Sequence, residues 1–76
     1  MQEVFIKTDF IKLGQALKLS GIAGSGTDAK FLISDGLVCV DGKVETRRGR
    51  KLFGREVVTF EDNSFKIVNI SDEKDR

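Results

Sequence analysis

The chain has 76 residues, 39% of them hydrophobic and 33% charged, and its formal net charge is +1. This composition is typical of one small folded domain and excludes a disordered chain. No apolar run reaches the roughly 20 residues of a transmembrane helix, and the N-terminus lacks the apolar core of a signal peptide. We therefore expect a cytoplasmic protein that does not bind a membrane.

The first part of the chain predicts a strand and then a helix. Residues 2–7 are rich in β-branched and aromatic residues, which favours a strand. Residues 9–19 predict a helix that Thr8 or Asp9 can cap and Gly21 can end. The apolar stripe of this helix consists of Phe10, Leu13, Ala16 and Leu17.

A second helix is predicted between Ser25 and Gly36. Ser25 and Asp28 have the S-x-x-D spacing of a capping box, in which each side chain satisfies a free backbone N–H. The same helix start exposes Ser25, Gly26 and Thr27, whose amides lie at the positive end of the helix dipole, and Lys30 follows one turn later. The buried face of this helix is expected to consist of Ala29, Leu32 and Ile33.

The second half predicts strands. LVCV and KVET flank Asp41-Gly42, a strong hairpin turn. Residues 47–54, RRGRKLFG, have no apolar period and are expected to form a basic loop, after which REVVTF and SFKIVNI predict two more strands. The charged tail, residues 71–76, has no apolar anchor and is expected to be frayed. The fold class is therefore α+β, with two short helices packed on a small, mostly antiparallel sheet of four to five strands. We expect a single domain over residues 1–76 and a monomer.

Residues 43–55, KVETRRGRKLFGR, are the main functional clue and are called the basic segment below. Six positive side chains against Glu45 give this segment a charge of +5, so the rest of the chain sums to −4. Such a run can be an ordinary solvated loop. However, its core RRGRK is mostly arginine, whose planar guanidinium pairs with phosphate and stacks on bases, so an anion-binding function is favoured.

Cysteine and aromatic residues add weaker expectations. The chain has no histidine, so a Cys–His pair is impossible and zinc would have at most one soft ligand. The lone Cys39 is expected to be a small buried thiol. Most of the six phenylalanines are expected in the core, while Phe31 and Phe53 could lie at a contact surface. We expect no enzyme activity, no metal and no cofactor.

Residues 12–57 resemble the S4-type RNA-binding domain, also called the alpha-L motif. The family pattern runs loosely as R-L-D-x-x-L-x-x-x-G-x-x-x-S-R-x-x-A-x-x-L-I-x-x-G-x-V-x-V-N-G, followed by a basic loop and G-D-x-V, and residues 12–42 align with its first part without a gap. The matching residues are Leu13, Leu17, Gly21, Ser25, Ala29, Leu32, Ile33, Gly36, Val38, Val40 and Gly42. The chain departs from the pattern at Lys12, Gly14, Gly26, Asp41 and Arg55.

The chain is also similar to the short stand-alone bacterial members of the family, and this resemblance implies a non-catalytic module that binds structured RNA. Ribosomal RNA or tRNA is the expected class of partner, and ribosomal particles are a further candidate. An alternative is a protein-interaction module whose basic face docks onto an acidic partner, because carboxylate and phosphate both suit arginine. The expected RNA-binding residues are Lys12, Ser25, Gly26, Thr27, Lys30, Lys43, Arg47, Arg48, Arg50 and Lys51.

Overall fold

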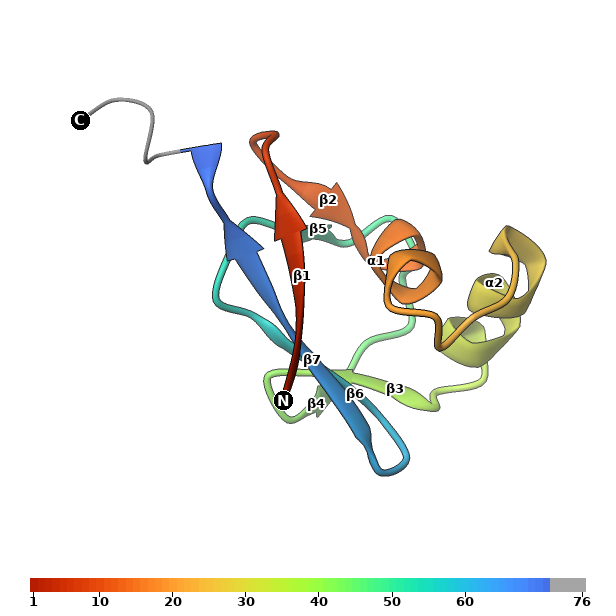
Figure 1. Cartoon of the computed structure of the whole chain (residues 1–76). Coiled ribbons are helices and arrows are strands. Elements are labelled where there is room, and N and C mark those ends of the chain that lie inside the picture. Colours follow the sequence, from red (N-terminus) through yellow and green to blue (C-terminus); the bar gives the residue numbers. More distant parts are fainter. Residues whose placement is uncertain (72–76) are drawn as a thin grey trace.

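A computed structural model describes residues 1–71 of the chain, so most of the tail that was expected to be frayed lies outside the described residues. Turns and loops join the strands and helices along the chain (Figure 1). The elements are β1 (Gln2–Ile6), β2 (Ile11–Lys12), α1 (Leu13–Leu19), α2 (Gly26–Ser34), β3 (Val38–Val40), β4 (Lys43–Val44), β5 (Lys51–Leu52), β6 (Val57–Phe60) and β7 (Asn63–Asn69).

The strands form two sheets. The main sheet has the order β1-β7-β6-β3-β4, in which β1 and β7 run parallel and the other neighbours run antiparallel. A second, two-stranded sheet pairs β2 with β5 and is called the ribbon below. The predicted α+β class, with two helices on a small, mostly antiparallel sheet, is confirmed, and the ribbon is an addition to it.

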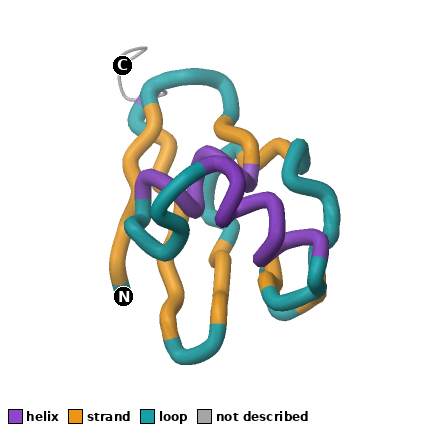
Figure 2. The backbone as a smooth tube through the Cα atoms, turned by 90° about the vertical axis from the view of Figure 1, so that its right-hand side faces the viewer, coloured by secondary structure: helices purple, strands orange, loops and turns teal. Residues whose placement is uncertain are grey.

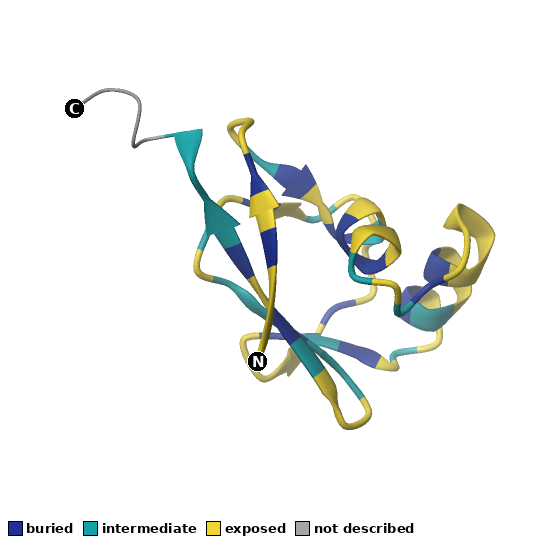
Figure 3. Cartoon of the chain, viewed as in Figure 1, coloured by how far each residue is buried: buried dark blue, intermediate teal, exposed yellow. Residues whose placement is uncertain are grey.

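The core lies between the two helices and the strands. In Figure 2 the helices lie in front of the strands, and Figure 3 shows buried positions alternating with exposed ones along β1. Both helices contribute most of the apolar faces that their spacing predicted, but Leu32 is only partly buried. Phe10, which was expected in the stripe of the first helix, lies before α1 and is also only partly buried. The largest fully buried side chains are Leu13, Leu17, Ile33, Val38, Leu52, Val58, Phe65 and Ile67.

Local turn chemistry works as the sequence predicts at several boundaries. Gly21 and Gly36 follow the two helices with φ of 86° and 76°, a conformation that glycine adopts without strain. The hydroxyl of Ser25 accepts a hydrogen bond from the amide of Asp28 at 3.1 Å, which is the serine half of the predicted capping box. Asp41 and Gly42 both have positive φ, as a two-residue hairpin turn requires.

The predicted start of the first helix is wrong. The helix begins at Leu13 rather than at residue 9, and neither Thr8 nor Asp9 caps it. The residues before Leu13 are extended because Ile11 and Lys12 form β2, which pairs with β5. The extended conformation is favoured over the helix that the local pattern predicts, because the pairing places Ile11 in the core, where it is 7% exposed.

The basic segment is also more ordered than a loop. Its residues Lys51 and Leu52 form β5, and the side chain of Leu52 is completely buried. The sequence prediction treated residues 47–54 as a loop without an apolar period, which is wrong for this part. A two-residue strand has too few positions for an alternation of polar and apolar residues to be visible.

Two expectations about burial are also wrong. Cys39 is only partly buried, because alternation along β3 directs Val38 and Val40 to the core and the thiol to the other face. Of the six phenylalanines only Phe65 is fully buried, whereas Phe5 on the outer face of β1 is 58% exposed. Phe31 and Phe53 lie at the surface as expected, with 58% and 56% exposure.

Neither of the two helices in the described part of the chain has the length and apolar character that a membrane span requires.

Candidate nucleic-acid interface

The basic segment is fixed against the start of α1 through its own backbone. The amide of Leu13 donates to the carbonyl of Arg50 at 2.9 Å, and the amide of Gly14 donates to the carbonyl of Arg48 at 3.0 Å. The first amides of a helix have no partner within the helix, and here the basic segment supplies acceptors for two of them. The backbone that carries Arg48 and Arg50 is therefore hydrogen-bonded to the first turn of α1.

Glu45 organises two of these arginines. Its carboxylate accepts hydrogen bonds from the amide and Nε of Arg47 at 3.1 and 3.0 Å, from Arg47 Nη2 at 3.1 Å, and from Arg50 Nη1 at 3.0 Å. Glu45 itself is only 7% exposed. The hydrogen bonds from Arg47 first, and then those from Arg50, lower the pKa of Glu45 from 4.5 to about 2.

The two arginines that contact Glu45 keep different amounts of free surface. The side chain of Arg47 is 75% exposed, so its outer edge remains open to a further anion, while that of Arg50 is 34% exposed. One carboxylate shared by two guanidinium groups leaves a net positive charge at this site. The charge of the basic segment is thus divided between an internal ion cluster and a surface that faces outward.

The outward surface includes a hollow that we call the basic pocket. Its volume is about 430 Å³, and three cationic side chains from separate elements line it: Lys12 from β2, Lys18 from α1 and Arg48 from the basic segment. Its lining contains no carboxylate that could neutralise these charges. The complete lining consists of Lys12, Gly14, Gln15, Lys18, Gly26, Ala29, Arg48 and Gly49.

The structure brings together some of the residues that the sequence singled out. Lys12, Gly26 and Arg48 line the basic pocket, although they are far apart in the sequence. The other residues lie outside its lining. Ser25, Thr27 and Lys30 are exposed at the start of α2, and Lys43 is exposed on the edge strand β4. Arg47 and Arg50 bind Glu45. Lys51 lies over the ring of Phe10.

Sequence reasoning missed two residues of this region. Lys18 lies on the exposed side of α1 and enters the pocket one turn after Gly14; its only sequence signal was its position off the apolar stripe. Glu45 was counted only as a negative charge within the basic segment. Its burial could not be predicted, because it depends on the fold that places both arginines around it.

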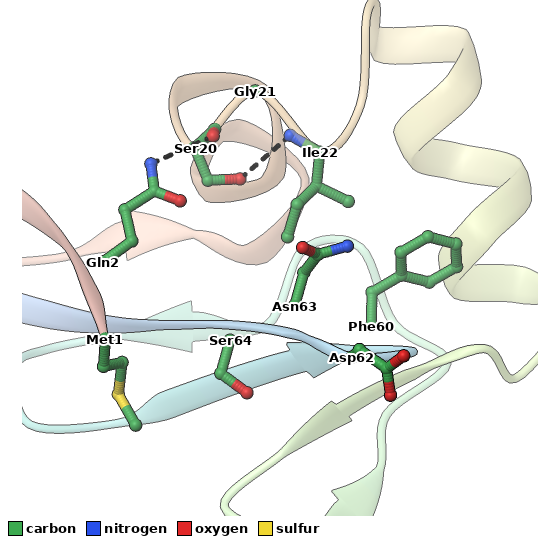
Figure 4. Close-up of a pocket in the computed structure, with 9 residues that line it drawn as sticks. All are labelled: Met1, Gln2, Ser20, Gly21, Ile22, Phe60, Asp62, Asn63 and Ser64. Carbon is green, nitrogen blue, oxygen red and sulfur yellow. Dashed lines mark hydrogen bonds between the residues drawn. The ribbon is translucent and has the colours of Figure 1, made fainter.

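A different hollow, of about 570 Å³, lies between the start of β1, the turn after α1 and the β6–β7 hairpin (Figure 4). Gln2 Nε2 donates to the carbonyl of Ser20 at 3.0 Å there and ties β1 to the end of α1. The hollow has no lysine or arginine in its lining, so it does not suit a phosphate. Its lining consists of Met1, Gln2, Ser20, Gly21, Ile22, Phe60, Asp62, Asn63 and Ser64.

Among residues 1–71, no group of three or more histidine, cysteine, aspartate or glutamate side chains is arranged to hold a metal ion. The lysines, arginines and backbone amides of the basic pocket are groups that can bind anions.

The sequence pattern of the S4 domain matches residues 4–68, and the chain belongs to this family. It is 43% identical over 67 residues to a Bacillus subtilis (strain 168) protein named "Probable ribosome maturation protein RlbA", covering 87% of this chain and 94% of that protein. It is 40% identical over 62 residues to the Escherichia coli (strain K12) protein named "Putative RNA-binding protein YbcJ", covering 82% of this chain and 89% of that protein.

A solved structure is similar as well. The solution structure of YbcJ from E. coli, described as revealing an αL motif involved in RNA binding, matches with a TM-score of 0.70 and 38% identity. The match covers 90% of this chain and 87% of YbcJ. The resemblance to the alpha-L motif that the sequence indicated is confirmed, and so is its likeness to short stand-alone members of the family.

Proposed function

We propose that this chain is a non-catalytic RNA-binding module that holds a structured RNA mainly through its phosphates. The observation that carries the proposal is the basic pocket, where Lys12, Lys18 and Arg48 converge from three elements without a neutralising carboxylate. Three cations held close together repel one another, and a bound polyanion removes that repulsion. The names of the relatives, which refer to RNA binding and ribosome maturation, support ribosomal RNA as the class of partner, with tRNA as the second candidate.

Backbone amides at the start of α2 also contribute to anion binding. Gly26 opens α2 and lines the pocket, so the first amides of this nine-residue helix and its dipole favour an anion beside Arg48. Asp28 in the first turn partly offsets that potential, which makes the side-chain cations the larger contribution. Arg47, with its side chain 75% exposed, adjoins Arg48 in the chain, and Lys30 is exposed one helical turn after Gly26, so both add positive charge beside pocket residues.

The shape of the surface indicates how RNA is read. A short, rigid face of cations and amides fits the sugar–phosphate backbone, and the deep, narrow major groove of an RNA helix excludes side chains. The module therefore recognises the shape of a folded RNA rather than a long base sequence. Ribosomal particles, which expose folded RNA, are a natural place for such a module to act.

A salt titration of the affinity for a folded ribosomal RNA hairpin tests the proposal. Each neutralised phosphate releases counterions, so affinity should fall steeply between about 50 and 200 mM salt. The variant Arg48→Gln should bind more weakly and reduce the slope of log K against log[salt] by about one unit. The matched control Arg55→Gln changes an exposed arginine outside the pocket and should behave like the parent protein.

Two results would contradict this function. Affinity for the hairpin that does not depend on salt would exclude binding through phosphates. Equal competition by an acidic polypeptide and by the RNA would instead favour the alternative, a protein-interaction module that docks onto acidic partners.

A further inference from the structure

The outer face of the ribbon carries two lysines that lie directly opposite each other. Ile11 and Leu52 are paired across the ribbon and are buried, so they form its inner face. The next pair is Lys12 and Lys51, which lie directly opposite each other and are both exposed. Like charges at directly opposed positions of an antiparallel pair are unfavourable. A bound anion between the two ammonium groups would offset this repulsion.

Two aromatic rings accompany these lysines on the same face. Alternation along the strands places Phe10 and Phe53 on the side opposite to the buried pair. Their ring centroids are 6.1 Å apart with an angle of 58° between the planes, and Phe53 remains 56% exposed. Lys51 Nζ lies 4.8 Å from the centre of the Phe10 ring, a cation–π distance. We call the side chains of Phe10, Lys12, Lys51 and Phe53 the aromatic platform.

The platform is held in place from both of its ends. Asn69 Nδ2 donates to the carbonyl of Thr8 at 3.0 Å and to the carbonyl of Phe53 at 2.9 Å, so it links the segments that carry the two rings. At the other end, the amide of Leu13 donates to the carbonyl of Arg50. Binding to a mobile loop costs free energy because the loop must become ordered. Binding to a fixed surface avoids most of this cost, so the affinity is higher.

The platform is continuous with the basic pocket. Lys12 belongs to both, because it lies on the outer face of the ribbon and also lines the pocket beside Arg48. An RNA strand whose phosphate binds in the pocket can therefore continue along the outer face of the ribbon, where Lys51, paired with Lys12, lies over Phe10 and Phe10 contacts Phe53. Flat aromatic faces beside cations are the arrangement on which proteins stack unpaired bases, whereas bases inside a duplex are already stacked.

We propose that the aromatic platform binds one unpaired nucleobase of the RNA, which stacks on Phe53 while its phosphates lie at Lys12 and Lys51. This inference rests on the proposed RNA-binding function and adds a preference to it. RNA with a bulged or otherwise unpaired nucleotide binds more tightly than a continuous duplex. The phosphate contacts supply the charge-dependent part of the affinity, and Phe53 supplies the selection for an unpaired base.

Two synthetic RNA hairpins with the same number of phosphates test this inference. One carries 2-aminopurine as a single-nucleotide bulge, and the other carries it paired with uridine. The full-length protein should bind the bulged hairpin about 5- to 150-fold more tightly, in line with the usual contribution of base–aromatic stacking. Binding should also change the fluorescence of the bulged 2-aminopurine, because its emission depends on stacking against neighbouring bases and the base would exchange these for Phe53.

Variants of Phe53 separate stacking from other contacts. Phe53→Ala and Phe53→Leu should lose the preference for the bulge without weakening binding to the paired hairpin, while Phe53→Tyr should keep it. The matched control is Phe31→Ala, because Phe31 is 58% exposed on α2 and Phe53 is 56% exposed. Phe53→Tyr retains the ring and its packing, so it tests the inference even where the alanine variant is unstable.

The outcomes are distinguishable. Equal, salt-dependent binding of both hairpins overturns the platform and leaves the proposed function standing. A Phe53→Leu variant that keeps the preference overturns stacking, since it indicates an apolar contact instead. If the parent protein binds neither hairpin in a salt-dependent way, the proposed function and the platform both fail.

Discussion

At the scale of single residues, charges that look alike in the sequence have different environments in the fold. Arg47 and Arg50 hold a buried carboxylate, whereas Arg48, between them in sequence, lines the basic pocket. This division could not be predicted from the sequence, because nothing in the run RRGR distinguishes its members. It also means that replacing all three arginines together would confuse two effects, since it would leave Glu45 buried without a partner.

The first prediction concerns Glu45 and its dependence on pH. Its pKa is lowered from 4.5 to about 2 in the folded protein, so its contribution to stability is complete above about pH 4.5 and is lost as the pH falls through 2. The variant Glu45→Gln should therefore lower the free energy of unfolding by about 1–2 kcal/mol at pH 7. Urea unfolding at several pH values should show the two proteins converging near pH 2.

The matched control for this experiment is Glu3→Gln. Glu3 is exposed on β1, and its side chain has no hydrogen-bond partner among the described residues. This variant should follow the parent protein at every pH. A stability difference between Glu45→Gln and the parent that is as large at pH 2 as at pH 7 would show that the carboxylate charge is not the cause.

At the scale of elements, the sequence predicts structure well where the signal is local. The hairpin turn at Asp41-Gly42 and the cap at Ser25 each depend on a few adjacent residues, and both are present. The ribbon was missed because its pairing joins Ile11 to Leu52, which are far apart in the sequence and lie in strands of two residues. The same pairing displaced the start of α1 to Leu13.

The second prediction tests the ribbon as part of the core. Leu52 is completely buried, so Leu52→Ala should remove a large apolar side chain from the core and leave a cavity, at a cost of about 2–5 kcal/mol. The control Leu37→Ala makes the same substitution at a side chain that is 51% exposed and should cost much less. Urea unfolding measures both. Similar destabilisation of the two variants would mean that the basic segment is a solvated loop.

At the scale of the whole molecule, net charge is a poor guide to the binding surface. The chain carries only +1, yet its basic segment carries +5 and the remaining residues carry −4. The fold then selects three cations from separate elements, Lys12, Lys18 and Arg48, and gathers them in one pocket. Attraction of RNA should therefore depend on this local field and little on the total charge, because salt at physiological strength screens charges beyond about 8 Å.

The last prediction separates local from total charge with two triple variants of equal composition. Lys12→Gln, Lys18→Gln and Arg48→Gln together remove the cations of the basic pocket. Lys7→Gln, Lys66→Gln and Arg55→Gln together remove two lysines and one arginine that are exposed outside it. Each variant lowers the net charge from +1 to −2.

Binding of a folded ribosomal RNA hairpin, followed over a range of salt concentrations, should distinguish the two triple variants. The pocket variant should reduce the salt slope by about three units, one for each phosphate that the protein no longer neutralises, and should bind far more weakly than the parent. The control variant should keep most of the affinity and the slope. Both should unfold at nearly the same urea concentration as the parent, because none of the six side chains is buried. An equal decrease of RNA affinity in the two variants would mean that total charge attracts RNA, and the basic pocket would then have no specific function.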